Sequence, residues 1–192
     1  LVPCDVFITE ATFALPVYCW PPGETVAKEI LQWWDRNAKA GRNSVLLCYA
    51  LGKAQRVLGE LAQLTDRGVH LHGAVDSIVE LYRDAGGSML PTERVDGRDK
   101  KKKFSGELVI APPSAAGSTW LRRFGDYEIG FASGWMRLRG SRRRRGYDRG
   151  FVLSDHADWP GLIDTVRGTG AKRVLATHGY SDAMVRYLQE QG

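Results

Sequence analysis

The sequence predicts an α/β protein with a mostly parallel sheet flanked by helices. Short apolar runs alternate with helical patterns along the chain, which is the order expected of βαβ units. Two of these runs, Ser44–Tyr49 and Leu108–Ala111, are apolar at almost every position, as is typical of strands buried on both faces of a parallel sheet. A length of 192 residues allows one good-sized core or parts of two domains.

Each element is expected from a local pattern of apolar residues bounded by turn residues. Strands are expected at Asp5–Thr9, Ser44–Tyr49, Val69–Leu71, Leu108–Ala111, Glu128–Ser133, Phe151–Leu153 and Arg173–Ala176. Helices are expected from Gly23 to Gly41, from Lys53 to Leu64, over Asp76–Arg83, over Ser118–Arg123, and between the last two strands. The most polar segment, Ser88–Ser105, is expected to be a surface loop.

The stretch from Gly150 to Tyr180 is predicted to carry the chemistry. It reads as strand, polar turn, helix, strand and polar turn, and each strand ends on a histidine, His156 or His178. Because the carboxyl ends of parallel strands meet at one edge of a sheet, we expect the two histidines to be neighbours. Asp155 and Asp158 stand beside the first of them. A single histidine is more often structural, but this arrangement favours an acid–base or metal site.

The positive charge is concentrated in two stretches, Thr92–Lys103 and Arg137–Arg149, of which the first is expected to be a solvated loop. Seven arginines against Asp148 alone lie between Arg137 and Arg149. Clustered guanidinium groups favour a polyanion such as nucleic acid, although a solvated loop would have the same composition. We expect a phosphate-binding role for the arginines that precede Tyr147. They are Arg137, Arg139, Arg142, Arg143, Arg144 and Arg145.

Composition and residue spacing also bear on the cellular compartment and on further metal-binding motifs. The apolar runs are too short to span a membrane, and no signal peptide is visible. Three cysteines without a CxxC pair predict neither a disulfide framework nor a zinc knuckle, so a reducing cytoplasm is expected. His70 and His72 lack the spacing of a metal motif and are assigned to a strand and its exit.

Three segments resemble, in order, motifs of the β-CASP group of metallo-β-lactamase-fold nucleases. The sequence DVFITEATF resembles motif A, SDHAD resembles motif B, and VLATHG resembles motif C. Between them, VLLCYALGKAQ and FASGWMRLRG are similar to the β-CASP domain of bacterial exonucleases associated with DNA ligase. The resemblance implies three regions. Residues 1–14 and 150–192 would belong to a metallo-β-lactamase αββα domain, and 15–149 would be the inserted β-CASP domain.

The resemblance also implies roles for individual residues. Glu10 would be the motif A acid that holds His156, and His156 would protonate the departing oxygen beside the scissile phosphate, with Asp155 and Asp158 in the same motif. His178 would bind one of two zinc ions, which together would activate a hydroxide in the way that two-metal phosphodiesterases do.

The family's other metal ligands lie before motif A, and nothing here precedes Leu1, so a fragment of a longer enzyme, inactive alone, is expected. Three functions remain open at this point. The first is part of a zinc-dependent exonuclease that acts on DNA, with a DNA ligase as partner. The second is the same chemistry on RNA, which the histidine at motif C favours. The third is a nucleic-acid-binding module without catalysis.

Overall fold

A computed structural model describes residues 1–95, 103–138 and 146–191. The chain divides into two compact units, and each is described by itself below. Unit 1 joins the two ends of the chain, Leu1–Trp20 and Ser154–Gly192, and unit 2 is the continuous segment Pro21–Leu153. The prediction of an α/β protein with parallel sheets flanked by helices is confirmed. Within the described residues, no helix is long and apolar enough to cross a membrane.

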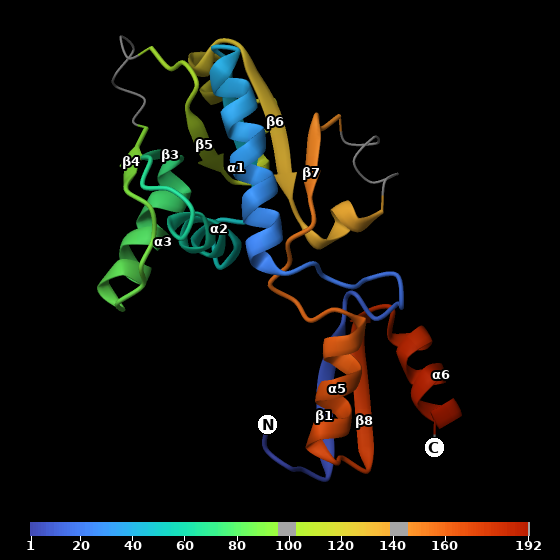
Figure 1. Ribbon diagram of the computed structural model, residues 1–192. Coiled ribbons are helices and arrows are strands. Elements are labelled where there is room, and N and C mark those ends of the chain that lie inside the picture. The colour runs from blue at the N-terminus through green and yellow to red at the C-terminus, as the bar shows by residue number, and fades with distance from the viewer. Residues whose placement is uncertain (96–102, 139–145, 192) are drawn as a thin grey trace. The chain divides into compact units, whose positions relative to one another are not determined.

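Unit 2 is built on a six-stranded parallel sheet with the strand order β4-β3-β5-β2-β6-β7 (Figure 1). Its strands are β2 (Asn43–Leu47), β3 (Val69–Leu71), β4 (Thr92–Arg94), β5 (Leu108–Ala111), β6 (Tyr127–Ala132) and β7 (Arg149–Phe151). Among the described residues of this unit, the α-helices are α1 (Gly23–Lys39), α2 (Lys53–Ala62) and α3 (Gly73–Asp84). Three 3₁₀ helices follow β5 and β6, namely η1 (Pro113–Ala115), η2 (Thr119–Phe124) and η3 (Gly134–Arg137).

Alternate residues of the central strands serve two separate cores. Leu46 and Ile110 point to the core formed with α1, α2 and α3. Val45 and Val109, one position earlier in the same strands, point to the core formed with η2 and η3. Both faces of the sheet are therefore covered, which explains why β2 and β5 are apolar at nearly every position.

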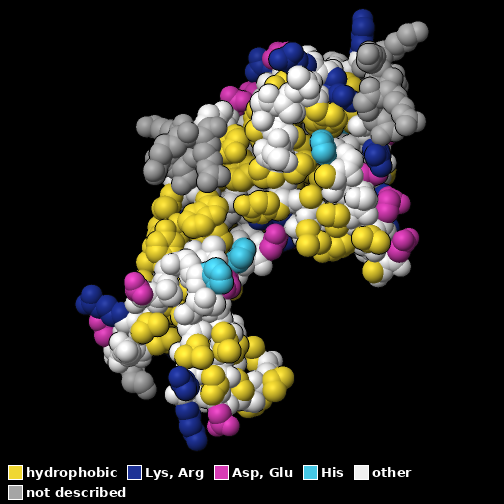
Figure 2. Space-filling model, turned by 180° about the vertical axis from the view of Figure 1, so that it is seen from behind, with side chains coloured by type: hydrophobic (Ala, Val, Ile, Leu, Met, Phe, Trp, Pro, Cys, Tyr) yellow, Lys and Arg dark blue, Asp and Glu magenta, His cyan; other side chains and the backbone are white. Residues whose placement is uncertain are grey.

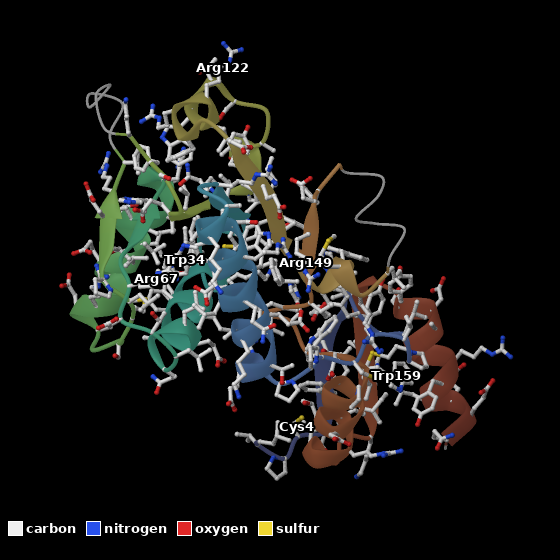
Figure 3. All side chains as sticks on the ribbon, turned by 45° about the horizontal axis from the view of Figure 1, so that its top comes forward. Cys4, Trp34, Arg67, Arg122, Arg149 and Trp159 are labelled. Atoms are coloured by element: carbon white, nitrogen blue, oxygen red, sulfur yellow. The ribbon has the colours of Figure 1, made fainter. Side chains whose placement is uncertain are left out.

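Polar contacts fix the helices of unit 2 to its sheet. The buried indole of Trp33 on α1 donates to Glu128 Oε2 on β6 at 2.7 Å. Arg67 lies 3.6 Å above the ring of Trp34, also on α1, and Figure 3 shows the two side chains together. The same guanidinium donates to Asp35 at 2.6 Å. These contacts satisfy polar atoms where the apolar core meets solvent.

Unit 1 contains a two-stranded parallel sheet of β1 (Val6–Ala11) and β8 (Arg173–Gly179). The helices α5 (Trp159–Thr169) and α6 (Ser181–Gln191) pack on this sheet (Figure 1). Leu162 and Val166 of α5 and Met184 of α6 meet the side chains of both strands in a small core. The opposite side of the sheet leaves Ile8 and Leu175 exposed.

Three expectations for the elements are wrong. Phe151 lies in β7, which pairs with β6, whereas β8 pairs with β1, so the two histidine-bearing strands do not form one βαβ unit. The polar segment Ser88–Ser105 contains the strand β4, and Leu90 beside it is buried, because hydrogen bonds to β3 compensate for its polarity. No helix was predicted beyond the last polar turn, but α6 occupies Ser181–Gln191 and buries Met184 in the small core of unit 1.

Candidate active site in unit 1

Glu10 stands at the carboxyl end of β1, where the strand is irregular. Glu10 pairs with Thr177 of β8, and the register then shifts so that Ala11 pairs with Gly179. The irregularity lets the chain turn back on the Glu10 side chain. The backbone N–H of Thr12 donates to Glu10 Oε2 at 2.6 Å, which holds the carboxylate in one orientation. Bulges of this kind often re-aim a side chain beside a site.

His156 reaches the same carboxylate from the loop that precedes α5. Its Nδ1 lies 3.2 Å from Glu10 Oε1. The loop itself is held at two points, because the His156 N–H donates to Ser154 Oγ at 3.2 Å and its carbonyl accepts from Trp20 Nε1 at 2.9 Å. The imidazole also meets the ring of Phe13 edge to face, with centroids 5.8 Å apart. Backbone and ring contacts thus fix the imidazole beside Glu10.

The contact with Glu10 determines how the imidazole can work. Partial burial acts to raise the pKa of the Glu10 carboxyl, but hydrogen bonds from Thr12 and His156 and attraction to His156 outweigh it, so this pKa lies below its usual value. Glu10 is therefore ionised at neutral pH and can only accept, which places a proton on Nδ1 of His156. The Nε2 atom is left to take or give a proton, and 47% of the side chain is exposed.

His178 occupies a strained position near the end of β8. It is the one non-glycine residue among those described with a left-handed backbone, at φ 60°. Such strain costs of order 1–2 kcal/mol for a residue with a Cβ and is often found at functional sites. The following glycine is required, because a Cβ on Gly179 would lie 2.4 Å from the carbonyl oxygen of Ala11. His178 is exposed, and its Nδ1 lies 3.1 Å from Thr177 Oγ1.

The two aspartates of the SDHAD segment differ in their contacts. Asp158 caps α5, since its Oδ1 accepts from the N–H of Gly161 at 3.0 Å, and its Oδ2 accepts from the N–H of Trp20 at 2.8 Å. Both oxygens are thus engaged with backbone groups, and Asp158 links the loop of His156 to the segment after β1. Asp155 lies on the surface one residue before His156.

A group of packed aromatic side chains lies next to this site. Phe13 meets the rings of Tyr18 and Trp20 edge to face, each with centroids 4.9 Å apart. Tyr18 is buried, its hydroxyl lies 3.4 Å from that of Tyr180, and burial raises its pKa well above the usual value. Because Phe13 also contacts His156, these packed rings support the imidazole from the protein interior. Figure 2 shows histidine side chains at the molecular surface.

The residues present do not complete a zinc site. Within residues 1–95, 103–138 and 146–191, no group of three or more His, Cys, Asp or Glu side chains could hold a metal ion. His178 is thus a single candidate ligand, whereas a catalytic zinc usually has three protein ligands. The expected arginine tract is described only at Arg137, an exposed residue of η3. Arg139, Arg142, Arg143, Arg144 and Arg145 lie outside the described residues.

Three residues of the site were missed by sequence reasoning. Thr12 follows Glu10 by two positions, and a carboxylate that turns back on the strand end is a recognisable local pattern. Ser154 precedes His156 by two positions and makes the same kind of turn. Trp20 gave no signal, because it contacts His156 across more than a hundred residues of sequence.

Comparison with known proteins gives one relative to report, and no known family profile matches the chain. The relative is a protein named "Probable DNA ligase" from Opitutus terrae, 30% identical over 188 residues. The match covers 98% of this chain but only 18% of the relative's length. The similarity thus extends over both units, and the chain corresponds to a small part of a protein whose name places it in DNA metabolism.

Proposed function

We propose that this chain acts in DNA metabolism and supplies the acid–base part of a phosphodiester-cleaving site, within a longer zinc-dependent nuclease. The observation that carries the proposal is the pair Glu10–His156, with Nδ1 and Oε1 3.2 Å apart. A histidine oriented by an ionised carboxylate, with its second nitrogen exposed, is the arrangement used for general acid–base catalysis. We assign unit 1 to a metallo-β-lactamase-like domain and unit 2 to the β-CASP insertion, on the motif resemblance alone.

In this proposal His156 Nε2 gives a proton to the oxygen that leaves phosphorus. Glu10 accepts from Nδ1 and keeps the second proton there, so the ring stays oriented and is neutral once Nε2 has released its proton. Zinc ions would supply the hydroxide that attacks phosphorus, but the described residues do not hold them, so His178 is at most one ligand of a site completed elsewhere. We favour DNA over RNA because the relative is named as a DNA ligase. That name also makes a ligase a plausible partner in the same polypeptide or complex.

The test uses a longer polypeptide that contains this chain and supplies the missing metal ligands. Incubation with 5′- and 3′-labelled DNA and RNA identifies the substrate and the direction of cleavage. We expect His156→Gln to reduce cleavage by about a hundred- to ten-thousand-fold, the usual contribution of a general acid. Asp164→Asn, on the exposed side of α5, is the matched control and should cleave normally.

A second measurement separates proton donation from folding. A substrate with a nitrophenyl leaving group needs little protonation, so it should restore much of the activity of His156→Gln. Equal loss on both substrates would contradict the role of His156 as the acid. The competing function, binding without catalysis, is favoured by the incomplete metal site, and it predicts tight DNA binding with no cleavage in any polypeptide that contains the chain.

A further inference from the structure

A cluster of basic side chains in unit 2 lies at the carboxyl ends of two neighbouring strands. His72 directly follows β3, and Arg94 is the last residue of β4. The pairing of β3 with β4 places these strand ends side by side, and Arg123 comes from η2, whose Trp120 ring meets His72. In α/β proteins, ligands bind in the crevice at this edge of the sheet. We call these three residues, together with Trp120, the β3–β5 basic cluster.

His72 is positioned to donate a hydrogen bond from its outer nitrogen. Its Nδ1 accepts from the N–H of Ala74 at 3.1 Å, as the N-cap of α3, so the neutral ring carries its proton on Nε2. Burial, and then repulsion by Arg123 and Arg94, hold the pKa of His72 below its usual value. Arg94 lies against Gly73, the residue after His72, and Arg123 lies against Trp120, whose ring meets His72. The cluster gathers positive charge at one point.

The arginine of β4 is held against the start of α3. A Cβ on Gly73 would lie 3.3 Å from Arg94 Nη2 and 3.5 Å from its Cζ and Nε, so the guanidinium lies against the backbone of the first residue of α3. Asp76 of the same helix lies 4.0 Å from Arg94 Nη1. With 55% of the Arg94 side chain exposed, the group keeps access to solvent and to a ligand.

The arginine of η2 is held by a neighbouring tryptophan. Arg123 Nε donates to the carbonyl of Trp120 at 3.0 Å, and the guanidinium lies 5.4 Å from the Trp120 ring centroid. The same ring meets His72 edge to face, with centroids 4.8 Å apart. Trp120 thus links Arg123 to His72. Arg122 next to it is exposed, and Figure 3 shows it pointing away from the rest of the molecule.

We propose that the β3–β5 basic cluster binds a backbone phosphate of single-stranded nucleic acid, through the guanidinium groups of Arg94 and Arg123 and the Nε2–H of His72. Guanidinium groups match phosphate oxygens in geometry as well as charge. Trp120 adds an aromatic edge of the kind found where single strands are bound. The inference rests on the proposed action on nucleic acid, but it needs neither cleavage nor zinc.

The experiment measures binding of the 192-residue chain to a fluorescent oligothymidylate at several salt concentrations. Arg123→Gln should weaken binding about tenfold, the cost of one charged hydrogen-bonded contact. It should also flatten the slope of log affinity against log salt by about 0.7, the value for one phosphate contact on a single strand. Arg122→Gln removes the same charge one residue away and should change the slope much less. Arg94→Gln removes the second guanidinium and should weaken binding and flatten the salt slope in the same way as Arg123→Gln.

A second measurement does not depend on the variants folding. In the unaltered chain, the imidazole resonances of His72 should shift on addition of oligothymidylate, and inorganic phosphate should compete for the same shift. Equal effects of Arg122→Gln and Arg123→Gln on the salt slope would overturn the proposal, as would an unmoved His72. A response to inorganic phosphate without any to the oligonucleotide would overturn the nucleic-acid assignment. Loss of cleavage with oligonucleotide binding intact would instead count against the proposed nuclease alone.

Discussion

Replacing Glu128 by alanine removes the main polar contact between helix α1 and strand β6. Its Oε2 accepts from the buried indole N–H of Trp33 at 2.7 Å and from Arg36 at 2.8 Å, and its Oε1 accepts from Arg42 at 3.3 Å. Leaving the indole N–H without an acceptor costs about 1–3 kcal/mol. Each partly exposed ion pair adds about 0.2–1 kcal/mol. The free energy of unfolding should therefore fall by about 1.5–5 kcal/mol.

Equilibrium urea unfolding, followed by tryptophan fluorescence and circular dichroism, measures this loss. Glu24→Ala is the matched control, because Glu24 is exposed and forms an ion pair with Lys28 one turn further along α1, so its loss should be much smaller than that of Glu128→Ala. Glu128→Gln keeps an acceptor for the indole and should cost less than Glu128→Ala. A cost for Glu128→Ala no larger than that of the Glu24 control would refute the reasoning.

The pH dependence of this contribution has a definite sign. Burial acts to raise the pKa of Glu128, but hydrogen bonds from Trp33 and Arg36 and the charge of Arg36 outweigh it, so the pKa in the folded state is lowered. A carboxyl with a lowered folded pKa stabilises the protein above its unfolded pKa, and this stabilisation is lost as the pH falls through the folded value. The difference in stability between the unaltered chain and Glu128→Gln should therefore be full at neutral pH and shrink below about pH 4.5, the ordinary value for this group.

Four further predictions concern the candidate active site. His156→Gln should raise the pKa of the Glu10 carboxyl, because the imidazole is lost while Thr12 still donates to the carboxylate. An unchanged Glu10 pKa in a carbon-detected NMR titration would contradict the interaction between Glu10 and His156. His178→Gly should raise the free energy of unfolding in urea by about 0.5 kcal/mol, because relief of the left-handed strain exceeds the entropy cost of a glycine. His178→Ala keeps the strain and should give no such increase. Gly179→Ala should destabilise by at least about 2 kcal/mol, since the new Cβ meets backbone, and a fold as stable as before would show that this turn adapts. After dialysis the unaltered chain should retain well below one zinc ion per chain, as measured by mass spectrometry. One zinc ion per unaltered chain that is lost in His178→Ala would contradict this.

Much of the fold follows from local pattern. The strands β3 and β5 fall on the predicted residues, and β2 begins one residue earlier than predicted, because each is a short apolar run bounded by turn residues. The strand β4 was missed, because a three-residue polar edge strand depends on pairing with β3 and not on its own composition. The pairing of β1 with β8 could not be predicted from the sequence either, because the choice of partner between distant strands depends on the whole fold.

The candidate site was predicted in part. The contact between Glu10 and His156 agrees with the motif resemblance, although the route by which the residues meet differs from the expected βαβ unit. The basic cluster around His72 was not foreseen, because its members come from three separate segments and each looks ordinary alone. His72 itself was assigned to the exit of a strand, and there it caps α3.

The pairing of the first strand with the last has a consequence for synthesis of the protein. On the ribosome β1 emerges before unit 2, and its partner β8 appears only after the whole of unit 2 has been made. Unit 2 is continuous in sequence and can collapse while translation proceeds. Once it has folded, the loop that separates β1 from β8 is effectively shortened, which lowers the entropy cost of bringing them together. Glu10 and His156 can therefore meet only after unit 2 has been made, so nascent chains that stop within unit 2 should lack the assembled pair.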